Sequence, residues 1–171
     1  MNPRRHFLTL LAALPLCASA LANPQTSAQK EPTMPPANAM LAPINPAGAA
    51  IPGISSAMVV DSGRLMFLSG HVPIDENGVV LGASLEAQLD QVFKNLNVTL
   101  QAAGATPGHL ARITIYVRDF QANQLPAIRR ARDRFINLSQ PPASALIGVA
   151  QLFHPDVLVE VDAVAVLPPN T

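Results

Sequence analysis

The nine residues LVEVDAVAV, 158–166, constrain the fold of this chain more than any other segment. All of them except Glu160 and Asp162 are apolar, which is typical of a strand covered on both faces. The two carboxylates project from the same face, about 7 Å apart by the rise of a strand. Carboxylates so close in a poorly solvated place raise each other's proton affinity, which suits a general acid or base. The pattern equally fits carboxylates that cap or pair with basic residues across a subunit interface, and both interpretations stay open.

The order of the other segments predicts an α+β domain. A mixed six-stranded β-sheet with two helices on one face accounts for the order β-β-α-β-α-β-β, with room for a short extra strand. The first two strands lie within 58–70 and turn at 61–63, so we expect the fold to open as a β-meander. The helices are predicted at 84–104 and 125–138, and the later strands at 112–119, 144–152 and 157–166.

The two predicted helices differ in how their polar residues are arranged. In the first, Ser84 is an N-cap and Gly104 a C-terminal stop around one apolar stripe. The second carries RRARDR at 129–134, where the arginines spread around the helix and Asp133 interrupts them. We therefore expect these arginines to form a solvated face rather than an RNA-binding site.

The second face of the predicted sheet needs a cover. Leu158, Val164 and Val166 surround the carboxylates on the face that the helices do not reach. This face is more apolar than a solvated face should be. Contact with copies of the same chain would bury it, so we expect a closed homo-oligomer with Glu160 at or near its interface.

Residues 1–22 predict the export signal of a bacterial protein. Arg4 and Arg5 precede the apolar run FLTLLAALPLCASALA, which is short for a membrane span and ends in small residues suited to cleavage. RRHFL also resembles the twin-arginine pattern, although a general secretory signal containing two arginines fits as well. The Pro- and Ala-rich residues 23–48 predict a flexible linker to a domain at 49–168. The expected location is the periplasm or the cell exterior, without membrane association after cleavage.

Composition excludes several kinds of chemistry. Cys17, the only cysteine among the 171 residues, lies in the predicted signal, so thiol catalysis and disulfides are excluded for the mature chain. His71, His109 and His154 lack metal-ligand spacing, so we expect no bound metal. Without the signal, nine basic and eleven acidic side chains leave a formal net charge of −2, which gives no reason to expect a nucleic-acid partner.

Six segments follow one another between about 49 and 166: IPGISSAM, LMFLSGHVPIDENG, EAQLDQVFKNLNVTLQAAGA, ITIYVRDF, PPASALIGVAQL and LVEVDAVAV. In this order and spacing they resemble the Rid family, the reactive intermediate deaminases also called the YjgF family. The resemblance implies a chorismate-mutase-like α+β fold, a homotrimer and three clefts between neighbouring subunits. It also implies hydrolysis of imines and enamines, such as 2-aminoacrylate, to a 2-keto acid and ammonia without a cofactor.

The resemblance carries two catalytic positions of the family onto this sequence. The glutamate that positions the attacking water falls on Glu160. The arginine that grips the substrate carboxylate falls on Ser144, where the chain departs from the family. A hydroxyl offers one neutral hydrogen bond in place of a charge-assisted fork, which should weaken an anionic substrate by a few kcal/mol. With no obvious cation beside it, Glu160 should have a raised pKa and could donate a proton.

Other positions of the implied cleft are also changed. The family's tyrosine falls on Ile54 and its cysteine on Leu146. Its Ser-Gly-Gln segment is present as Ser69, Gly70 and His71. The missing side chain of the glycine lets a ligand or another chain approach the backbone, or only marks a bend. A more apolar cleft favours a neutral or weakly polar small-molecule ligand.

Three kinds of function fit these observations. The first is a periplasmic hydrolase of imines, enamines or related small carbonyl-nitrogen compounds, in which Glu160 directs water and Ser144 helps to hold the substrate. The second is a trimeric small-molecule-binding or interaction protein without catalysis, which the lost arginine favours. A ribonuclease, a label that some relatives carry, is the weakest because the mature net charge is negative and only 4% of the residues are aromatic.

Overall fold

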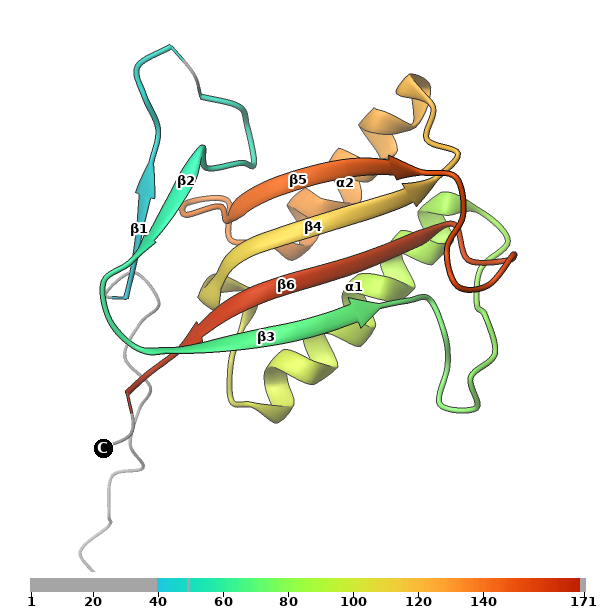
Figure 1. Ribbon diagram of the computed structural model, residues 1–171, viewed down its shortest axis with the longest axis horizontal. Helices are drawn as coiled ribbons and strands as arrows, with labels where there is room; N and C mark the ends of the chain where they lie inside the picture. The colour runs from blue at the N-terminus through green and yellow to red at the C-terminus, as the bar shows by residue number, and fades with distance from the viewer. Residues whose placement is uncertain (1–39, 49, 170–171) are drawn as a thin grey trace, which may run out of the picture. The chain divides into compact units, whose positions relative to one another are not determined.

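A four-stranded β-sheet with two helices on one face is the frame of the domain in the computed structural model, which describes residues 40–48 and 50–169 (Figure 1). The strands are β1 (Leu41–Ile44), β2 (Ala57–Val60), β3 (Arg64–His71), β4 (Leu110–Arg118), β5 (Ala143–Val149) and β6 (Val159–Leu167). The helices are α1 (Leu85–Ala102) and α2 (Leu125–Phe135), with short 3-10 turns η2 (Pro107–His109) and η3 (Ala122–Gln124). The predicted α+β class and its two helices are confirmed.

The strands form two sheets rather than one continuous sheet of six. The larger has the order β3-β6-β4-β5, in which β4 and β5 are parallel and the other pairs antiparallel. The parallel pair needs a crossover, which α2 supplies. β1 is the extra strand, and it forms a separate antiparallel pair with β2. The predicted β-meander is wrong because β2 pairs with β1, whereas β3 pairs with β6.

β1 comes from a segment that the sequence predicts to be a flexible linker. In its described part, 40–48, Met40 and Leu41 are buried in a small apolar cluster with Ala111 and Val166. Burial of these side chains gives the segment a definite place, which its Pro- and Ala-rich composition hides. The predicted export signal and the earlier part of the linker lie outside the described residues. Within the described ranges, no helix has both the length and the hydropathy needed to cross a membrane.

The main core lies between the sheet and α1, as the apolar stripe of that helix predicts. Ser84 caps α1, since its Oγ accepts a hydrogen bond from the backbone N–H of Ala87 at 3.3 Å. Phe93 of α1 stacks on Phe135 of α2 with ring centroids 4.8 Å apart, which joins the two helices. The buried side chains shared by α1 and the sheet include Leu89, Val92, Leu96, Leu100, Ile113, Ile115, Val117, Val159 and Val161.

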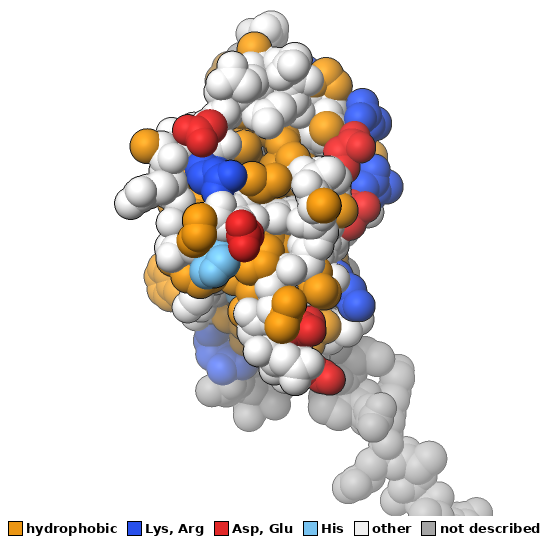
Figure 2. Space-filling model, turned by 90° about the vertical axis from the view of Figure 1, so that its right-hand side faces the viewer, with side chains coloured by type: hydrophobic (Ala, Val, Ile, Leu, Met, Phe, Trp, Pro, Cys, Tyr) orange, Lys and Arg blue, Asp and Glu red, His pale blue; other side chains and the backbone are white. Residues whose placement is uncertain are grey.

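Two arginines of α2 lie in the predicted solvated face. Arg130 is exposed and pairs with Glu86 of α1, with 2.7 Å between Nη2 and Oε1. Arg134 pairs in the same way with Asp90 at 2.5 Å. Figure 2 shows acidic and basic side chains alternating along its right-hand edge, the helix side of the domain. Exposed pairs of this kind contribute little to stability.

Arg132 corrects the prediction of a wholly solvated face, because its side chain is only 5% exposed. Its guanidinium donates to the backbone oxygen of Pro52 at 3.1 Å and to the carboxylate of Asp133 at 2.9 Å. Gly53, at φ 73°, leaves the space for this guanidinium, which a Cβ would overlap. Arg132 therefore holds the segment before β2, a contact that the periodicity of a helix cannot show.

Gln88 of α1 is the polar centre of the fold. Its side chain is buried, and both ends of its amide are hydrogen-bonded to backbone. Nε2 donates to the oxygens of Gly82 and Asp156 at 3.0 and 2.8 Å. Oε1 accepts from the N–H of Leu158 at 2.7 Å. One side chain thereby joins the loop before α1 to the turn before β6 and sets where β6 begins.

Replacing Gln88 with leucine should lower the free energy of unfolding by about 2–4 kcal/mol, because three backbone groups lose their partner inside the protein. Urea unfolding followed by circular dichroism measures the change. The matched control is Gln101→Leu at the exposed end of α1, which should change stability by less than about 0.5 kcal/mol. Equal effects of the two substitutions would contradict the role of Gln88.

Candidate functional site

Glu160 and Asp162 lie on the face of the sheet that the helices leave open. Side chains of β6 alternate between the buried core and this face, where the two carboxylates are partly exposed. On the neighbouring strand β4, Tyr116 lies opposite Glu160. Thr114 lies opposite Asp162 in the same register. The predicted pair of carboxylates therefore shares one surface with a phenol and a hydroxyl group.

Tyr116 gives Asp162 a partner within the chain. The tyrosine hydroxyl donates to Asp162 Oδ2 at 2.9 Å. This hydrogen bond raises the pKa of Tyr116, and burial and the charge of Asp162 raise it further. Asp162 thus acts as the acceptor of a hydrogen bond beside Glu160, which is a role that neither interpretation of the sequence had assigned to it.

Glu160 has a raised proton affinity. Burial raises the pKa of Glu160, and the negative charge of Asp162 raises it further. No side chain among the described residues stabilises its ionised form by a hydrogen bond. The direction matches the expectation from the sequence. A carboxyl group of this kind exchanges protons closer to neutral pH than an exposed glutamate does.

The end of β3 approaches Glu160 closely at Gly70. A Cβ at this position would overlap the carboxyl group of Glu160, so the glycine leaves the space that this carboxyl group occupies. The register between β3 and β6 shifts between Leu68 and His71, which accommodates it. Gly70, and with it the neighbouring Ser69, is therefore brought to Glu160 within one chain.

The other predicted cleft residues lie at a different edge of the sheet. Ser144 and Leu146 belong to β5, the edge strand farthest from β3. Leu146 packs against the core on the helix side. Ile54 lies in the segment before β2, and the residue after it bridges to the first residue of β5. A single chain thus gathers these three residues around β5, apart from the group around Glu160.

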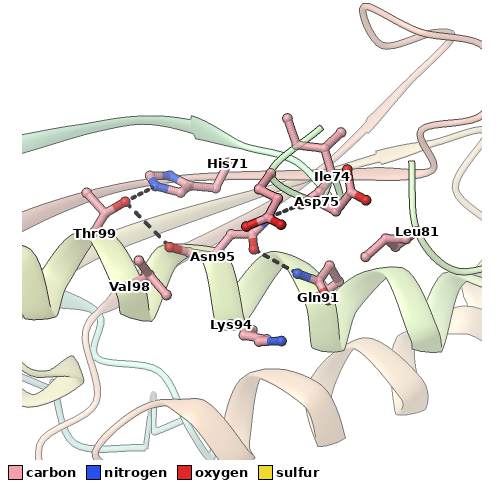
Figure 3. Close-up of a pocket in the computed structure, with 10 residues that line it drawn as sticks. His71, Ile74, Asp75, Leu81, Gln91, Lys94, Asn95, Val98 and Thr99 are labelled. Atoms are coloured by element: carbon pink, nitrogen blue, oxygen red, sulfur yellow. Dashed lines mark hydrogen bonds between the residues drawn. The ribbon is translucent and has the colours of Figure 1, made fainter. Parts of the chain in front are cut away.

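A hollow of about 560 Å³ opens between α1 and the segment after β3 (Figure 3). His71 lies in its wall, with Nε2 2.8 Å from Thr99 Oγ1 and Nδ1 2.7 Å from the backbone oxygen of Ser69. Asn95 of α1 donates hydrogen bonds to the backbone oxygens of Val72 and Ile74, each at 2.8 Å, and so holds the segment after β3 against the helix. Glu160 is not part of the lining. The hollow and the perturbed carboxyl group are therefore separate features.

Among the described residues, no three histidine, cysteine, aspartate or glutamate side chains come together as a metal site. Two histidines have local structural partners instead. His109 Nδ1 accepts the backbone N–H of Thr106 at 3.1 Å, and burial lowers the pKa of this histidine. His154 Nδ1 accepts the backbone N–H of Asp156 at 3.2 Å. The buried Nε2 of His109 has no hydrogen-bond partner among the described residues.

Comparison with known proteins decides the family. Residues 48–167 match the family described as endoribonuclease L-PSP. Protein DfrA of Myxococcus xanthus is 33% identical over 118 residues, which cover 68% of this chain and 87% of DfrA. The crystal structure of YyfB from Yersinia pestis, described as a member of the conserved Rid family, is similar with a TM-score of 0.72 at 35% identity. That similarity covers 75% of this chain and 99% of YyfB. The chain belongs to the Rid family.

Some Rid proteins that resemble this one are named for an activity. The 2-iminobutanoate/2-iminopropanoate deaminase of Salmonella typhimurium is 28% identical over 109 residues, which cover 63% of this chain and 83% of the deaminase. The family resemblance that six sequence segments predicted is confirmed, and with it the chorismate-mutase-like α+β fold of Rid proteins.

Two side chains of β4 that share a face with the carboxylates were not singled out from the sequence of this Rid domain. Tyr116 and Arg118 lie on the same face of β4 as Thr114, as the alternation of RITIYVRD indicates. Their importance depends on the pairing of β4 with β6, which brings residues more than 40 positions apart side by side. Local periodicity contains no information on that pairing.

Replacing Asp162 with asparagine should lower the pKa of Glu160, because a nearby negative charge is removed. The pKa should remain above that of an exposed glutamate, since burial is the larger cause. A carbon-13 NMR titration of the glutamate carboxyl groups measures it. Asp156→Asn, which removes an exposed carboxylate outside this pair, is the control. If both substitutions leave the pKa unchanged, Asp162 does not act on Glu160 as described.

Proposed function

We propose that this protein is a cofactor-free hydrolase of imines, enamines or related small carbonyl-nitrogen compounds. The observation that carries the proposal is Glu160, a partly buried carboxyl group of raised pKa next to the backbone of Gly70. The relatives named 2-iminobutanoate/2-iminopropanoate deaminase support this reaction class. The export signal predicted from the sequence would place the hydrolase in the bacterial periplasm or outside the cell.

Hydrolysis of an imine needs a group that both accepts and donates a proton. Ionised Glu160 accepts a proton from water while the water oxygen attacks the carbon of the C=N bond. The carboxyl group returns that proton to the nitrogen, which gives a carbinolamine. A second transfer by the same group, from the new hydroxyl to the nitrogen, breaks the C–N bond and leaves a carbonyl compound and ammonia. A raised pKa suits Glu160 to both directions of transfer.

A homotrimer would complete the site. The open face of the sheet exposes Leu65 and Phe67 of β3, and Phe67 is 75% exposed. Apolar side chains gathered in this way usually mark a contact with another protein surface. Packing against copies of the chain would bury them and could bring Ser144 of one subunit to Glu160 of the next. Clefts between subunits would then hold both groups of predicted residues.

Ser144 determines which ligand that end of the cleft would suit. A serine cannot replace the two charge-assisted hydrogen bonds that an arginine makes with a carboxylate. Ile54 and Leu146 contribute apolar surface near the same strand. A neutral or weakly polar group of the ligand therefore fits best at the β5 end, and a 2-imino acid held there by its carboxylate would bind weakly.

A trimeric small-molecule-binding or interaction protein without catalysis is the second candidate. Serine at position 144 favours it, because a chain released from selection for catalysis could keep the fold and lose the carboxylate fork. RNA cleavage, although part of the description of the family, is not proposed. The formal net charge of the whole chain is zero, which offers no electrostatic attraction for a phosphate backbone.

The mature chain should sediment as a trimer in analytical ultracentrifugation, and Phe67→Glu should dissociate it because a charge would enter the proposed interface. Val98→Glu is the matched control: Val98 is an exposed apolar residue of α1, on the helix side. A natural chain that remains monomeric, or a Phe67→Glu chain that remains trimeric, would contradict the proposed assembly.

Ammonia release from 2-iminopropanoate, generated in place by an amino acid oxidase, tests the activity. Glu160→Gln should lower the rate by about 100-fold or more, since it removes the acid-base group. Ser144→Arg should raise kcat/KM by about 10-fold or more by restoring the fork. Ser62→Arg, at an exposed turn, controls for the added charge. Equal, measurable rates for the natural chain and Glu160→Gln would refute the role of Glu160. Inactivity of every chain, Ser144→Arg included, would contradict hydrolysis of 2-imino acids.

A further inference from the structure

Arg118, the last residue of β4, lies on the same face of the sheet as Glu160. Tyr116 is directly opposite Glu160, and the N–H of Arg118 donates to the backbone oxygen of Leu158 at 2.9 Å. Alternation along β4 therefore makes Arg118 the diagonal neighbour of Glu160. Diagonal neighbours in an antiparallel pair are about 7–8 Å apart, which is within reach of a long side chain. The guanidinium can thus meet a ligand that contacts Glu160.

The guanidinium of Arg118 is available for a ligand. Its side chain is only 25% exposed, yet it donates no hydrogen bond to any described residue. Its ion pair with Asp119 is long, at 3.7 Å, and that carboxylate is itself 74% exposed. Arg132 provides the contrast, since its guanidinium donates to a backbone oxygen and to a carboxylate. Arg118 therefore keeps donors that face solvent and are free to bind a ligand.

A hollow of about 470 Å³ adjoins Arg118 at the end of the sheet where β4 ends and β6 begins. Its wall includes Gly82 from the loop before α1 and Leu158, which lies two residues before Glu160. Glu160 itself is not part of this lining, so Arg118 and Leu158 are what connect the hollow to it. Gln88 also lines it, but its amide is already used by the backbone. Figure 2 looks onto this end, where basic, acidic and hydrophobic side chains are mixed.

The charges around this hollow favour an anion at Arg118. Of the residues that line the hollow, Arg118 carries a positive charge and Asp156 a negative charge. The carboxylate of Asp156 is 77% exposed, so it is well solvated and competes little for Arg118. An anionic group beside Arg118 would replace the weak pairing with Asp119 by a two-bond fork, the geometry that arginine offers to carboxylates.

We propose that Arg118 binds the carboxylate of a ligand whose carbonyl or imine carbon lies at Glu160. The inference rests on the proposed function and names its substrate class: small carbonyl-nitrogen compounds whose carboxylate is a few bonds away from the reacting carbon. The ligand then presents its neutral part to Ser144 and its charged part to Arg118. Arg118 on β4 would then bind the ligand carboxylate, which Ser144 cannot bind in this way.

Tyr116 makes the test direct, because it is the only tyrosine of a chain that has no tryptophan. Its fluorescence reports on ligands next to Glu160 without requiring turnover. The mature, assembled protein is titrated with 4-oxopentanoate and with its uncharged amide, 4-oxopentanamide. The acid should bind at least about 10-fold more tightly than the amide. Arg118→Gln should remove that difference while leaving the affinity for the amide unchanged, and Arg118→Lys should retain part of it.

Arg112→Gln is the matched control. Arg112 is an exposed arginine on the same face at the other end of β4, so its loss changes the net charge equally and should not affect the acid. The proposal is overturned if acid and amide bind equally, if the acid does not saturate the natural chain, or if Arg118→Gln binds the acid as the natural chain does. If the acid binds through Arg118 but the protein releases no ammonia from imines, only the proposed hydrolase activity is refuted. If the protein releases ammonia but the acid binds equally well without Arg118, only the role of Arg118 is refuted.

Discussion

The hydrogen bonds of the buried Gln88 amide are the constraint on which the functional face depends. They connect the first turn of α1 to the loop before it and to Leu158, immediately ahead of β6. Because side chains of a strand alternate, a slip of one residue in β6 would turn Glu160 and Asp162 into the core and bring Val159 and Val161 to the open face. The Gln88 amide penalises such a slip, since its hydrogen bonds to Asp156 and Leu158 would be lost. The register of β6 is thus set from the helix as well as from its neighbouring strands.

Much of the fold could be predicted because short segments of the sequence contain the patterns that determine it. The apolar stripe and N-cap of α1, the alternation of β4 and β6, and the closeness of Gly70 to the end of a strand all lie within short segments. The errors concern contacts between distant segments. β1 was missed because its pairing with β2 and its burial depend on tertiary structure, and the solvated face of α2 was overstated because the partner of Arg132 lies 80 positions away. Propensity does not report on such contacts, which tertiary packing decides.

The candidate site divides in the same way. Resemblance to a family could assign Glu160, Ser69 and Gly70, which the structure brings together, and Ser144, Leu146 and Ile54, which it gathers elsewhere. It could not show that the groups lie around different strands, because sequence order says nothing about which sheet edge a residue occupies. From the sequence, only the direction of the pKa shift of Glu160 could be predicted. Burial is the larger cause of the raised pKa of Glu160 and the charge of Asp162 the smaller one, and the burial depends on how the strands pack.

The pairing of β1 with β2 limits how far the N-terminal segment can extend. With Met40 and Leu41 buried, the ordered domain takes up residues 40–48, which the sequence had assigned to the linker. Only residues 23–39 then separate the predicted cleavage site from the domain, and fully extended they span at most about 60 Å. The full predicted linker would have reached about 30 Å farther. A partner that holds the mature N-terminus would have to lie within this shorter distance of the domain.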